Sequence, residues 1–298
     1  MIVITGATGQ IGGQLLTHLL ASGRPVRVIA RDPGKLPAGV RDRVEVVPGS
    51  YGDPQVVDQA FKGADAMFWL LAADRQAATP YDAFVEFSRP AIEAIGREGV
   101  GHVVSVTALG RGTAYESRAG YITAALALDD LLAGTGAAFR ALAMPSFMDN
   151  LLRQVRVIKE HGVFFGVTDP DLKLPTVATR DIAAVAARLL LDLSWTGQQE
   201  IPVLGPEDLS ENDRAAIMSE VLGTPVRYQQ NPYQAHKDQL LGLGMSEPMA
   251  QGMVDMGIAK NHGLDQGVTR TAQDAIDTPT TFRQWCEDTL LDALRAAG

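Results

Sequence analysis

The sequence predicts an α/β protein built on a doubly wound parallel sheet, with a smaller and mostly helical C-terminal part. Two observations lead to this prediction. Strand-like apolar runs alternate with helical patterns through the first half of the chain, and a glycine-rich turn follows the first run. Such alternation is typical of βαβ units, and a glycine turn between the first strand and the first helix is typical of the Rossmann fold. We expect a dinucleotide-binding Rossmann domain over residues 1–155, with 176–205 returning to it, and a substrate-binding domain over 206–298.

The Rossmann part is predicted from short β-branched or apolar runs that are separated by amphipathic patterns. Strands are expected at residues 2–5, 26–30, 44–47, 66–71, 103–106 and 139–143. Helices are expected near residues 10–21, 54–62, 81–98 and 121–133. Strands that are joined through helices in this way lie parallel in one sheet.

The pattern changes after residue 145. One helix is expected over residues 147–161, followed by a loop and a short strand up to residue 179. A second helix is expected over residues 182–191, with Thr179 or Asp181 as its cap. A strand at residues 201–204 is then expected to return to the sheet.

The C-terminal part reads as mostly helical. Ser210 and Asp213 have the spacing of a capping box, which opens a helix up to residue 222. A short strand is expected at 226–229, and a final helix from the Thr278-Pro279 pair through residue 294. The methionines at helical spacing predict a core stripe, with an adaptable pocket as the alternative: Met245, Met249, Met253 and Met256.

The glycine turn has the spacing that phosphate binding requires. Gly6, Gly9 and Gly12 follow the first strand at three-residue intervals. The first glycine allows a tight turn, the second lets backbone N–H groups approach a pyrophosphate, and the third lets the helix pack closely on the strand. The N-terminus of the helix then faces the anion. The expected pyrophosphate-binding residues are Gly6, Thr8, Gly9, Gln10 and Ile11.

The composition is that of an acidic globular protein. The chain has 298 residues, 46% of them apolar and 20% charged, and a formal net charge of −9 at pH 7. This charge opposes nucleic-acid binding, and the apolar stretches are too short to span a membrane. Cys286 is the single cysteine and the five histidines are scattered, so no metal site is expected. Because the first strand starts at Ile2, we expect no targeting peptide and a cytoplasmic monomer or homodimer.

Several further motifs occur in order along nearly the whole chain. They are Thr5-Gly-Ala-Thr-Gly-Gln-Ile-Gly12, Val26-Arg-Val-Ile-Ala-Arg31-Asp32-Pro33, Pro145-Ser-Phe-Met-Asp-Asn150, Val177-Ala-Thr-Arg-Asp-Ile-Ala-Ala184, Leu204-Gly-Pro-Glu-Asp208 and Thr278-Pro-Thr-Thr-Phe282. Together they resemble the NmrA-like family of atypical short-chain dehydrogenases. The resemblance implies a Rossmann domain with a small C-terminal substrate domain, and NADP or NAD as the cofactor. That family contains quinone-reductase-like enzymes, other reductases, and regulators that bind the nucleotide without turning it over.

The residues after the second strand favour NADP over NAD. Arg31 stands at the end of that strand and Lys35 follows one turn later, so two cations are available for the 2′-phosphate of NADP. Asp32 lies between them and can cap the loop through an Asx-turn. The alternative for Arg31 is a solvated charge at a strand end. We expect NADP, with NAD as the alternative cofactor.

The segment after the third strand offers no aspartate for the adenine at positions 49 and 50. Gly49-Ser50 stands where relatives often have an aspartate after the third strand. The nearby Asp53 precedes a proline and is expected to begin a helix instead. An adenine contact through a carboxylate is therefore not expected from this segment.

The catalytic residues of an ordinary short-chain dehydrogenase are present only in part. Such enzymes use a serine or threonine after the fifth strand and a Tyr-x-x-x-Lys pair, and here Ser105 and Thr107 occupy the strand end. Tyr121 begins the next helix, but Ala125 stands in the place of the lysine. Without that charge the pKa of Tyr121 is expected near about 10, which makes a weak acid at neutral pH. Arg118 is a candidate for a substitute charge, and a purely structural Tyr121 is the alternative.

The missing lysine indicates a class of substrate. Reduction of a quinone or another conjugated acceptor gives a stabilised, weakly basic anion, so a weak acid suffices. An apolar pocket is expected from Leu71, which ends the fourth strand beside the cofactor, and from Phe147 and Asn150 after the sixth strand. A plain sheet core is the alternative for the apolar residues. The catalytic candidates are thus Thr107, Tyr121 and Asn150, and Thr107 is also expected to contact the cofactor.

Three functions are consistent with these residues. The first is an NAD(P)H-dependent oxidoreductase that acts on a quinone-like or conjugated aromatic small molecule. The second is a nucleotide-binding, redox-sensing regulator without turnover. The third is an enzyme that tailors an aromatic natural product by oxygenation or isomerisation. Family resemblance predicts the fold better than it predicts the activity.

Overall fold

The computed structural model describes residues 1–297, and within them a central sheet contains seven parallel strands. The strands are β1 (Ile2–Ile4), β2 (Val26–Ala30), β3 (Glu45–Pro48), β4 (Ala66–Trp69), β5 (His102–Ala108), β6 (Ala138–Met144) and β10 (Gln198–Pro202). Their order across the sheet is β10-β6-β5-β4-β1-β2-β3. The chain therefore starts in the middle, runs to one edge, returns to β4 beside β1, and continues to the other edge. The predicted doubly wound parallel sheet is confirmed.

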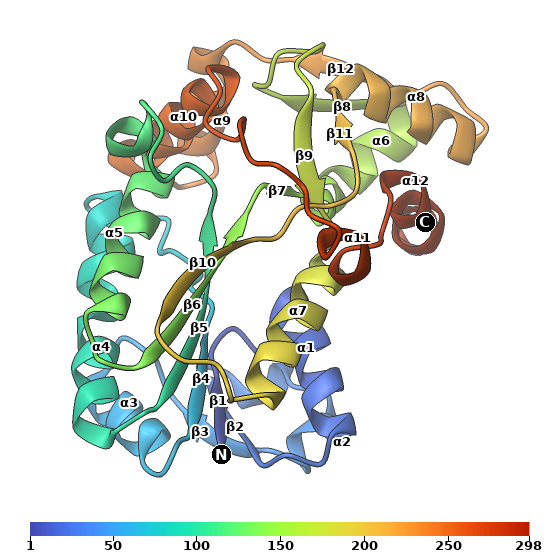
Figure 1. Ribbon diagram of the computed structural model, residues 1–298. Helices are drawn as coiled ribbons and strands as arrows, with labels where there is room; N and C mark the ends of the chain where they lie inside the picture. Colours follow the sequence, from blue (N-terminus) through green and yellow to red (C-terminus); the bar gives the residue numbers. More distant parts are fainter. Residues whose placement is uncertain (298) are drawn as a thin grey trace.

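Helices cover both faces of the sheet (Figure 1). One face carries α1 (Gln10–Ala21), the short α2 (Ala38–Arg41) and α7 (Thr179–Leu191), and the other carries α3 (Pro54–Phe61), α4 (Phe87–Glu98) and α5 (Tyr121–Ala133). The side chains of β1 alternate between the two cores, with Ile2 and Ile4 in one and Val3 in the other. Because both faces are buried, the inner strands β1 and β4 are continuous apolar runs.

The remaining elements lie beyond the carboxyl ends of the central strands, in the upper half of Figure 1. β7 (Ser146–Phe147), β9 (Leu174–Val177) and β11 (Asp208–Leu209) form one small sheet, and β8 (Val163–Gly166) pairs with β12 (Arg227–Gln230). The helices of this part are α6 (Val155–His161), α8 (Glu211–Leu222), α9 (Tyr233–Gly242), α10 (Glu247–Asn261), α11 (Asp274–Asp277), α12 (Phe282–Trp285) and α13 (Leu291–Ala296). Tighter or wider turns are η1 (Pro33–Lys35), η2 (Asp82–Glu86), η3 (Glu116–Arg118), η4 (Met148–Gln154) and η5 (Cys286–Leu290).

The helix expected over residues 147–161 is wrong in its first half. Phe147 is extended and pairs with Val177 in β7 and β9, and the 3-10 helix η4 follows before α6 begins. The side chain of Gln154 ties the end of η4 to β8, because it donates to the carbonyl of Phe165 and accepts the Phe165 N–H. These contacts come from a strand more than ten residues away, so the local apolar pattern did not indicate them.

Two helix starts also differ from the expectation. α7 begins at Thr179, and Asp149 accepts both the N–H and the hydroxyl of Thr179, at 2.9 and 2.8 Å. Asp181 instead accepts the N–H and the hydroxyl of Thr280, which ties the segment after α11 to α7. The final helical segment therefore begins at Phe282 with Thr281 as its cap.

The capping box at Ser210 and Asp213 is confirmed, since each side chain accepts the other residue's N–H, at 3.1 and 3.0 Å. The methionine stripe is partly core. Met249 is fully buried in α10, and Met256 packs against a small cluster around Ile122.

Candidate functional site

The turn between β1 and α1 is built where only glycine fits. Gly6 has a φ of +67°, and its carbonyl accepts the N–H of Gly9 at 2.9 Å. A β-carbon on Gly12 would lie 2.2 Å from the Gly6 carbonyl oxygen. Gly9 precedes α1 and brings no side chain over the N–H groups of its first turn. The turn thus presents backbone donors and a helix N-terminus at one place, which fits a pyrophosphate.

The predicted 2′-phosphate residues lie at the end of β2. Arg31 and Lys35 are both exposed, and the Lys35 ammonium is 4.0 Å from the Asp32 carboxylate. Asp32 caps η1 by accepting the Gly34 N–H at 3.0 Å, so its predicted turn is confirmed. The Arg31 guanidinium and the Lys35 ammonium are thus both exposed at this strand end.

The backbone after β3 favours glycine at position 49. Gly49 has a φ of +139°, and a β-carbon on it would lie 2.5 Å from Val56. Any larger residue would collide with α3 at this point. Asp53 caps α3 by accepting the Gln55 N–H at 2.9 Å, as expected.

Two neighbouring cavities lie at the carboxyl edge of the sheet. The first, of about 470 Å³, is lined by Gln10 and Ile11 of the glycine turn, by Leu70 after β4, and by Phe147 and Asn150. The second, of about 150 Å³, is also lined by Phe147 and Asn150. The structure therefore brings the glycine turn and the predicted pocket residues together. Leu71 itself packs against the core on the other face of the sheet, so the cavity contact belongs to its neighbour Leu70.

Thr107 lies near a buried carboxyl, that of Asp129, which was not predicted from the sequence. Ser105, on the same face of β5, donates its hydroxyl to Asp129 of α5 at 2.9 Å. The Thr107 hydroxyl faces this carboxyl as well, yet it is buried without a well-formed hydrogen bond to any of residues 1–297. Burial raises the pKa of Asp129 to about 7, against the opposing effect of the two hydroxyls. An acidic residue inside the apolar run of α5 was the available signal.

Tyr121 lies in a packed environment at the start of α5. Its hydroxyl has the sulfur of Met245 as a partner, at 3.9 Å, and its ring meets the edge of Phe84. α10 also approaches closely, since a β-carbon on Gly252 would be 3.1 Å from the ring. Burial raises the pKa of Tyr121, and the nearby charge of Arg75 opposes that shift. Tyr121 is thus an even weaker acid than its ordinary value implies.

Arg118, the cation suggested as a substitute charge for Tyr121, contacts Tyr115 instead. The guanidinium of Arg118 stacks over the ring of Tyr115, 4.6 Å from its centroid. It also lines a cavity between α5 and α10, on the outer side of α5. Arg75, and not Arg118, is the cation that acts on the Tyr121 hydroxyl.

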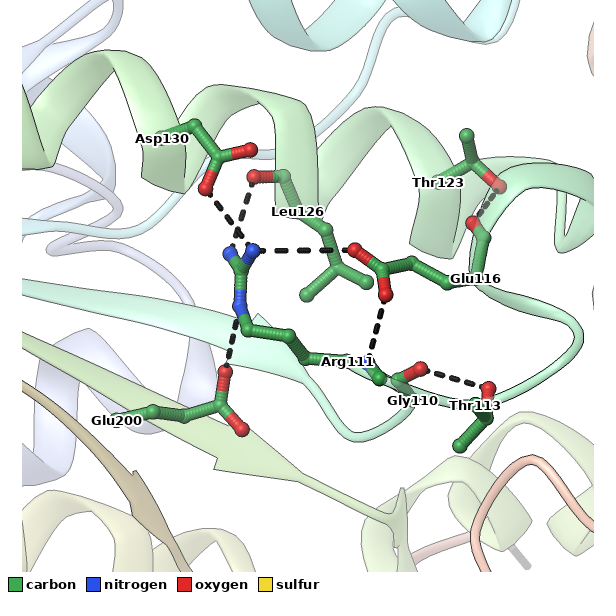
Figure 2. A network of polar contacts seen from close by, with 9 residues as sticks. Gly110, Arg111, Thr113, Glu116, Thr123, Leu126, Asp130 and Glu200 are labelled. Atoms are coloured by element: carbon green, nitrogen blue, oxygen red, sulfur yellow. Dashed lines mark hydrogen bonds and ion pairs between the residues drawn. The ribbon is translucent and has the colours of Figure 1, made fainter.

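The loop that joins Thr107 to Tyr121 is held by Arg111 (Figure 2). Its guanidinium contacts Asp130 of α5 at 2.9 Å, Glu200 of β10 at 3.1 Å, and the carbonyl of Leu126. Glu116 accepts the N–H of Gly112 at 2.6 Å and so closes the turn. This network keeps the loop against α5, so the segment between the two predicted catalytic residues has a defined position.

The sequence matches two family models. An NAD(P)H-binding family matches residues 6–193, and the NmrA-like family matches residues 137–286. The chain belongs to the NmrA-like family. The NAD(P)H-binding match begins at Gly6, so the NAD(P)H-binding domain of this NmrA-like protein includes the glycine turn.

Relatives and solved structures share nearly the full length of this NmrA-like protein. A (4-alkanoyl-5-oxo-2,5-dihydrofuran-3-yl)methyl phosphate reductase from Streptomyces griseus is 30% identical and is aligned over 96% of both chains. An NAD(P)H azoreductase from Xenophilus azovorans is 28% identical over 86% of both. An NADPH-dependent quinone oxidoreductase from Escherichia coli, solved with NADPH, superposes with a TM-score of 0.78 at 23% identity, over 100% of this chain and 99% of that one.

Across residues 1–297, no helix has the length and apolar character needed to cross a membrane. The same residues contain no cluster of His, Cys, Asp or Glu side chains arranged to hold a metal ion.

Proposed function

We propose that this protein is an NADPH-dependent reductase of quinone-like or other conjugated aromatic acceptors. The main support is the cavity of about 470 Å³, which is lined both by Gln10 and Ile11 of the phosphate turn and by Phe147 and Asn150. A nucleotide held at the turn would thus lie next to an apolar space that suits a flat conjugated ring. The names of relatives agree with this chemistry, because they include a reductase of an unsaturated lactone and an azoreductase.

Residues of the chain account for the binding of the cofactor. The turn from Gly6 to Ile11 would hold the pyrophosphate, and Arg31 with Lys35 would hold the 2′-phosphate of NADP. When bound, NADPH supplies a hydride, which together with one proton from solvent converts a quinone into a hydroquinone and leaves NADP⁺. Nothing else has to be oxidised or reduced for this reaction to balance.

The side chains near β5 would pass the proton to the substrate. The Thr107 hydroxyl is buried beside Asp129 and lacks a good partner among the described residues. It would donate to a substrate oxygen at the end of β5. Asp129, whose pKa is raised to about 7, would hold a proton behind Thr107 at neutral pH. Asn150 would orient the ring through its amide. Because a quinone gives a stabilised anion, this arrangement suffices without a lysine at position 125.

The test is steady-state oxidation of NADPH with a panel of acceptors that includes 1,4-naphthoquinone and an azo dye. We expect turnover well above the uncatalysed rate for at least one conjugated acceptor, and weaker turnover with NADH. Binding of NADPH is measured separately by calorimetry. Tight cofactor binding with no turnover across the panel would contradict the proposal and would instead support a nucleotide-sensing regulator.

A further inference from the structure

The smaller of the two cavities at the sheet edge has charged side chains at one end, and the proposed reaction gives them no role. Its volume of about 150 Å³ is close to that of a cavity able to hold a benzene ring. Four of its lining residues are aromatic, namely Phe147, Phe164, Phe165 and Tyr228. Arg214 and Glu211, both from the first turn of α8, also line it.

Arg214 and Glu211 form a buried ion pair. The residues are only 7% and 8% exposed, and an Nη atom of Arg214 lies 3.2 Å from a carboxylate oxygen of Glu211. The capping box of Ser210 and Asp213 holds this turn of α8 in place. The ring of Phe282 lies beside the guanidinium, with its centroid 5.9 Å away.

One nitrogen of the Arg214 guanidinium has no partner in the described part of the protein. A guanidinium carries five N–H donors, yet the Nε of Arg214 is buried and has no hydrogen-bond partner within the described part of the chain. Arg140 offers a direct comparison, because it is 8% exposed and donates to the carbonyls of Phe139, Thr196 and Gly197. Buried donors in native proteins are normally paired in this way. The Nε of Arg27 and an Nη atom of Arg180 are also unpaired among the described residues, but neither arginine lines one of the two cavities at the sheet edge. The unpaired Nε of Arg214, together with the place of this residue in the lining of the smaller cavity, therefore points to a ligand there.

We propose that Arg214 binds an oxygen substituent of the substrate, at the end of the molecule that enters the smaller cavity. This inference rests on the proposed function. Since Glu211 balances the charge of Arg214, the site suits a neutral conjugated carbonyl better than a free carboxylate or phosphate. When the acceptor is reduced, negative charge develops on that oxygen and the contact with the guanidinium strengthens. The substrate class is thus a flat conjugated compound with a carbonyl oxygen at each end, such as a quinone.

The experiment measures binding without turnover. Calorimetric titrations of the NADP⁺-loaded protein use 1,4-naphthoquinone, naphthalene and 1-naphthoate as probes, because no hydride is available in that form. The single thiol, Cys286, is buried and its pKa is raised to about 12, so the quinone probe is not expected to alkylate the protein. We expect wild-type protein to bind 1,4-naphthoquinone much more tightly than the other two probes.

The variants separate a binding role from a structural one. Arg214→Gln leaves the buried Glu211 carboxylate without its partner and so risks misfolding. The double variant E211Q/R214Q removes both charges, and we expect it to bind naphthoquinone about 10- to 100-fold more weakly with unchanged binding of naphthalene. Arg214→Lys, which keeps the charge, should show an intermediate loss. Arg156→Gln, which breaks an exposed pair with Glu160, serves as the control.

The outcomes distinguish the role of Arg214 in substrate binding from the proposed reductase function. Equal loss of naphthoquinone and naphthalene binding in the double variant, or no loss of either, would overturn the role of Arg214. Tighter binding of 1-naphthoate than of naphthoquinone would overturn the carbonyl class in favour of an anion site. Failure of the proposed function appears separately, as absent NADPH oxidation by the wild-type protein, while the calorimetric difference persists.

Discussion

The hydroxyl of Ser105 donates to the buried carboxyl of Asp129 across 2.9 Å, and this bond joins β5 to α5 beside Thr107. The contact places an ionisable group inside the sheet–helix interface, where its charged form is poorly solvated. Burial therefore raises the pKa of Asp129 from 3.8 to about 7. A carboxyl with this pKa affects both the stability of the fold and the proton supply of the proposed site.

Asp129→Asn is expected to make the protein more stable at high pH. Because the folded protein holds the proton of Asp129 more tightly than the unfolded chain does, the stability of the wild type falls as the pH rises from about 4 to about 7. Three pKa units correspond to an upper bound of about 4 kcal/mol, so we expect the variant to gain about 2–4 kcal/mol in unfolding free energy at pH 8. The gain should shrink toward pH 5.

Urea denaturation at pH 5 and pH 8 checks this expectation. Asp130→Asn is the matched control, since Asp130 is the neighbouring residue and its side chain is 66% exposed. That control should change stability by less than about 1 kcal/mol. A destabilised Asp129→Asn at pH 8 would mean that the carboxylate is stabilised inside the fold, contrary to the expectation.

Gly12→Ala is expected to disrupt the phosphate turn. The added β-carbon would lie 2.2 Å from the Gly6 carbonyl oxygen, so α1 must move away from β1. We expect NADPH affinity to fall at least about 10-fold and the unfolding free energy to fall by about 1–3 kcal/mol. Gly13→Ala is the control, because its β-carbon would meet only the Ala7 carbonyl oxygen at 3.7 Å. Equal NADPH affinities of the two variants would count against the turn as the pyrophosphate site.

The central sheet and the phosphate turn were predictable from the sequence because their signals are local. The apolar runs, the glycine spacing and the capping box at Ser210 each lie within a few residues of the structure they determine. The start of α7 was not predictable in the same way. Its cap is Asp149, which lies 30 positions before Thr179 in the chain and meets it only in the folded protein.

The candidate site also contains residues with local sequence signals and residues whose role depends on distant contacts. Gln10, Ile11 and Asn150 line one cavity, as their places after β1 and β6 suggested. Asp129 and Arg214 were missed because a charged residue on a helix normally faces solvent, and their burial depends on packing against distant elements. Arg118 was proposed as a charge for Tyr121, but its side chain stacks on Tyr115 instead.

Replacement of the cations after β2 should separate NADPH from NADH binding. Arg31 is exposed at the strand end and Lys35 follows in η1, so both are available to the 2′-phosphate. We expect R31A/K35A to weaken NADPH binding about 10- to 100-fold and to leave NADH binding unchanged, as measured by calorimetry. Arg24→Ala, at the opposite end of β2, should change neither. A parallel loss of both nucleotides would argue that these residues stabilise the turn and do not read the phosphate.

Thr107→Val tests the proposed role of the hydroxyl. Valine keeps the shape of threonine, and the hydroxyl that it removes is buried with no good partner among residues 1–297. The unfolding free energy should therefore stay the same or rise slightly, while kcat with a quinone falls about 10- to 100-fold. Steady-state kinetics and thermal denaturation of the same preparation give both values. A variant with unchanged kcat would remove Thr107 from the mechanism.

Tyr121→Phe should be nearly silent, in contrast to Thr107→Val. The Tyr121 hydroxyl has a methionine sulfur as its partner, and a thioether is a weak acceptor. Its pKa is raised by burial, so it is a poor proton donor at neutral pH. We expect kcat/KM with 1,4-naphthoquinone to stay within about 3-fold of the wild type, because the ring contact with Phe84 is retained. A loss of more than about 100-fold would instead make Tyr121 the acid, and the packing of α10 against its ring would then have to open during turnover.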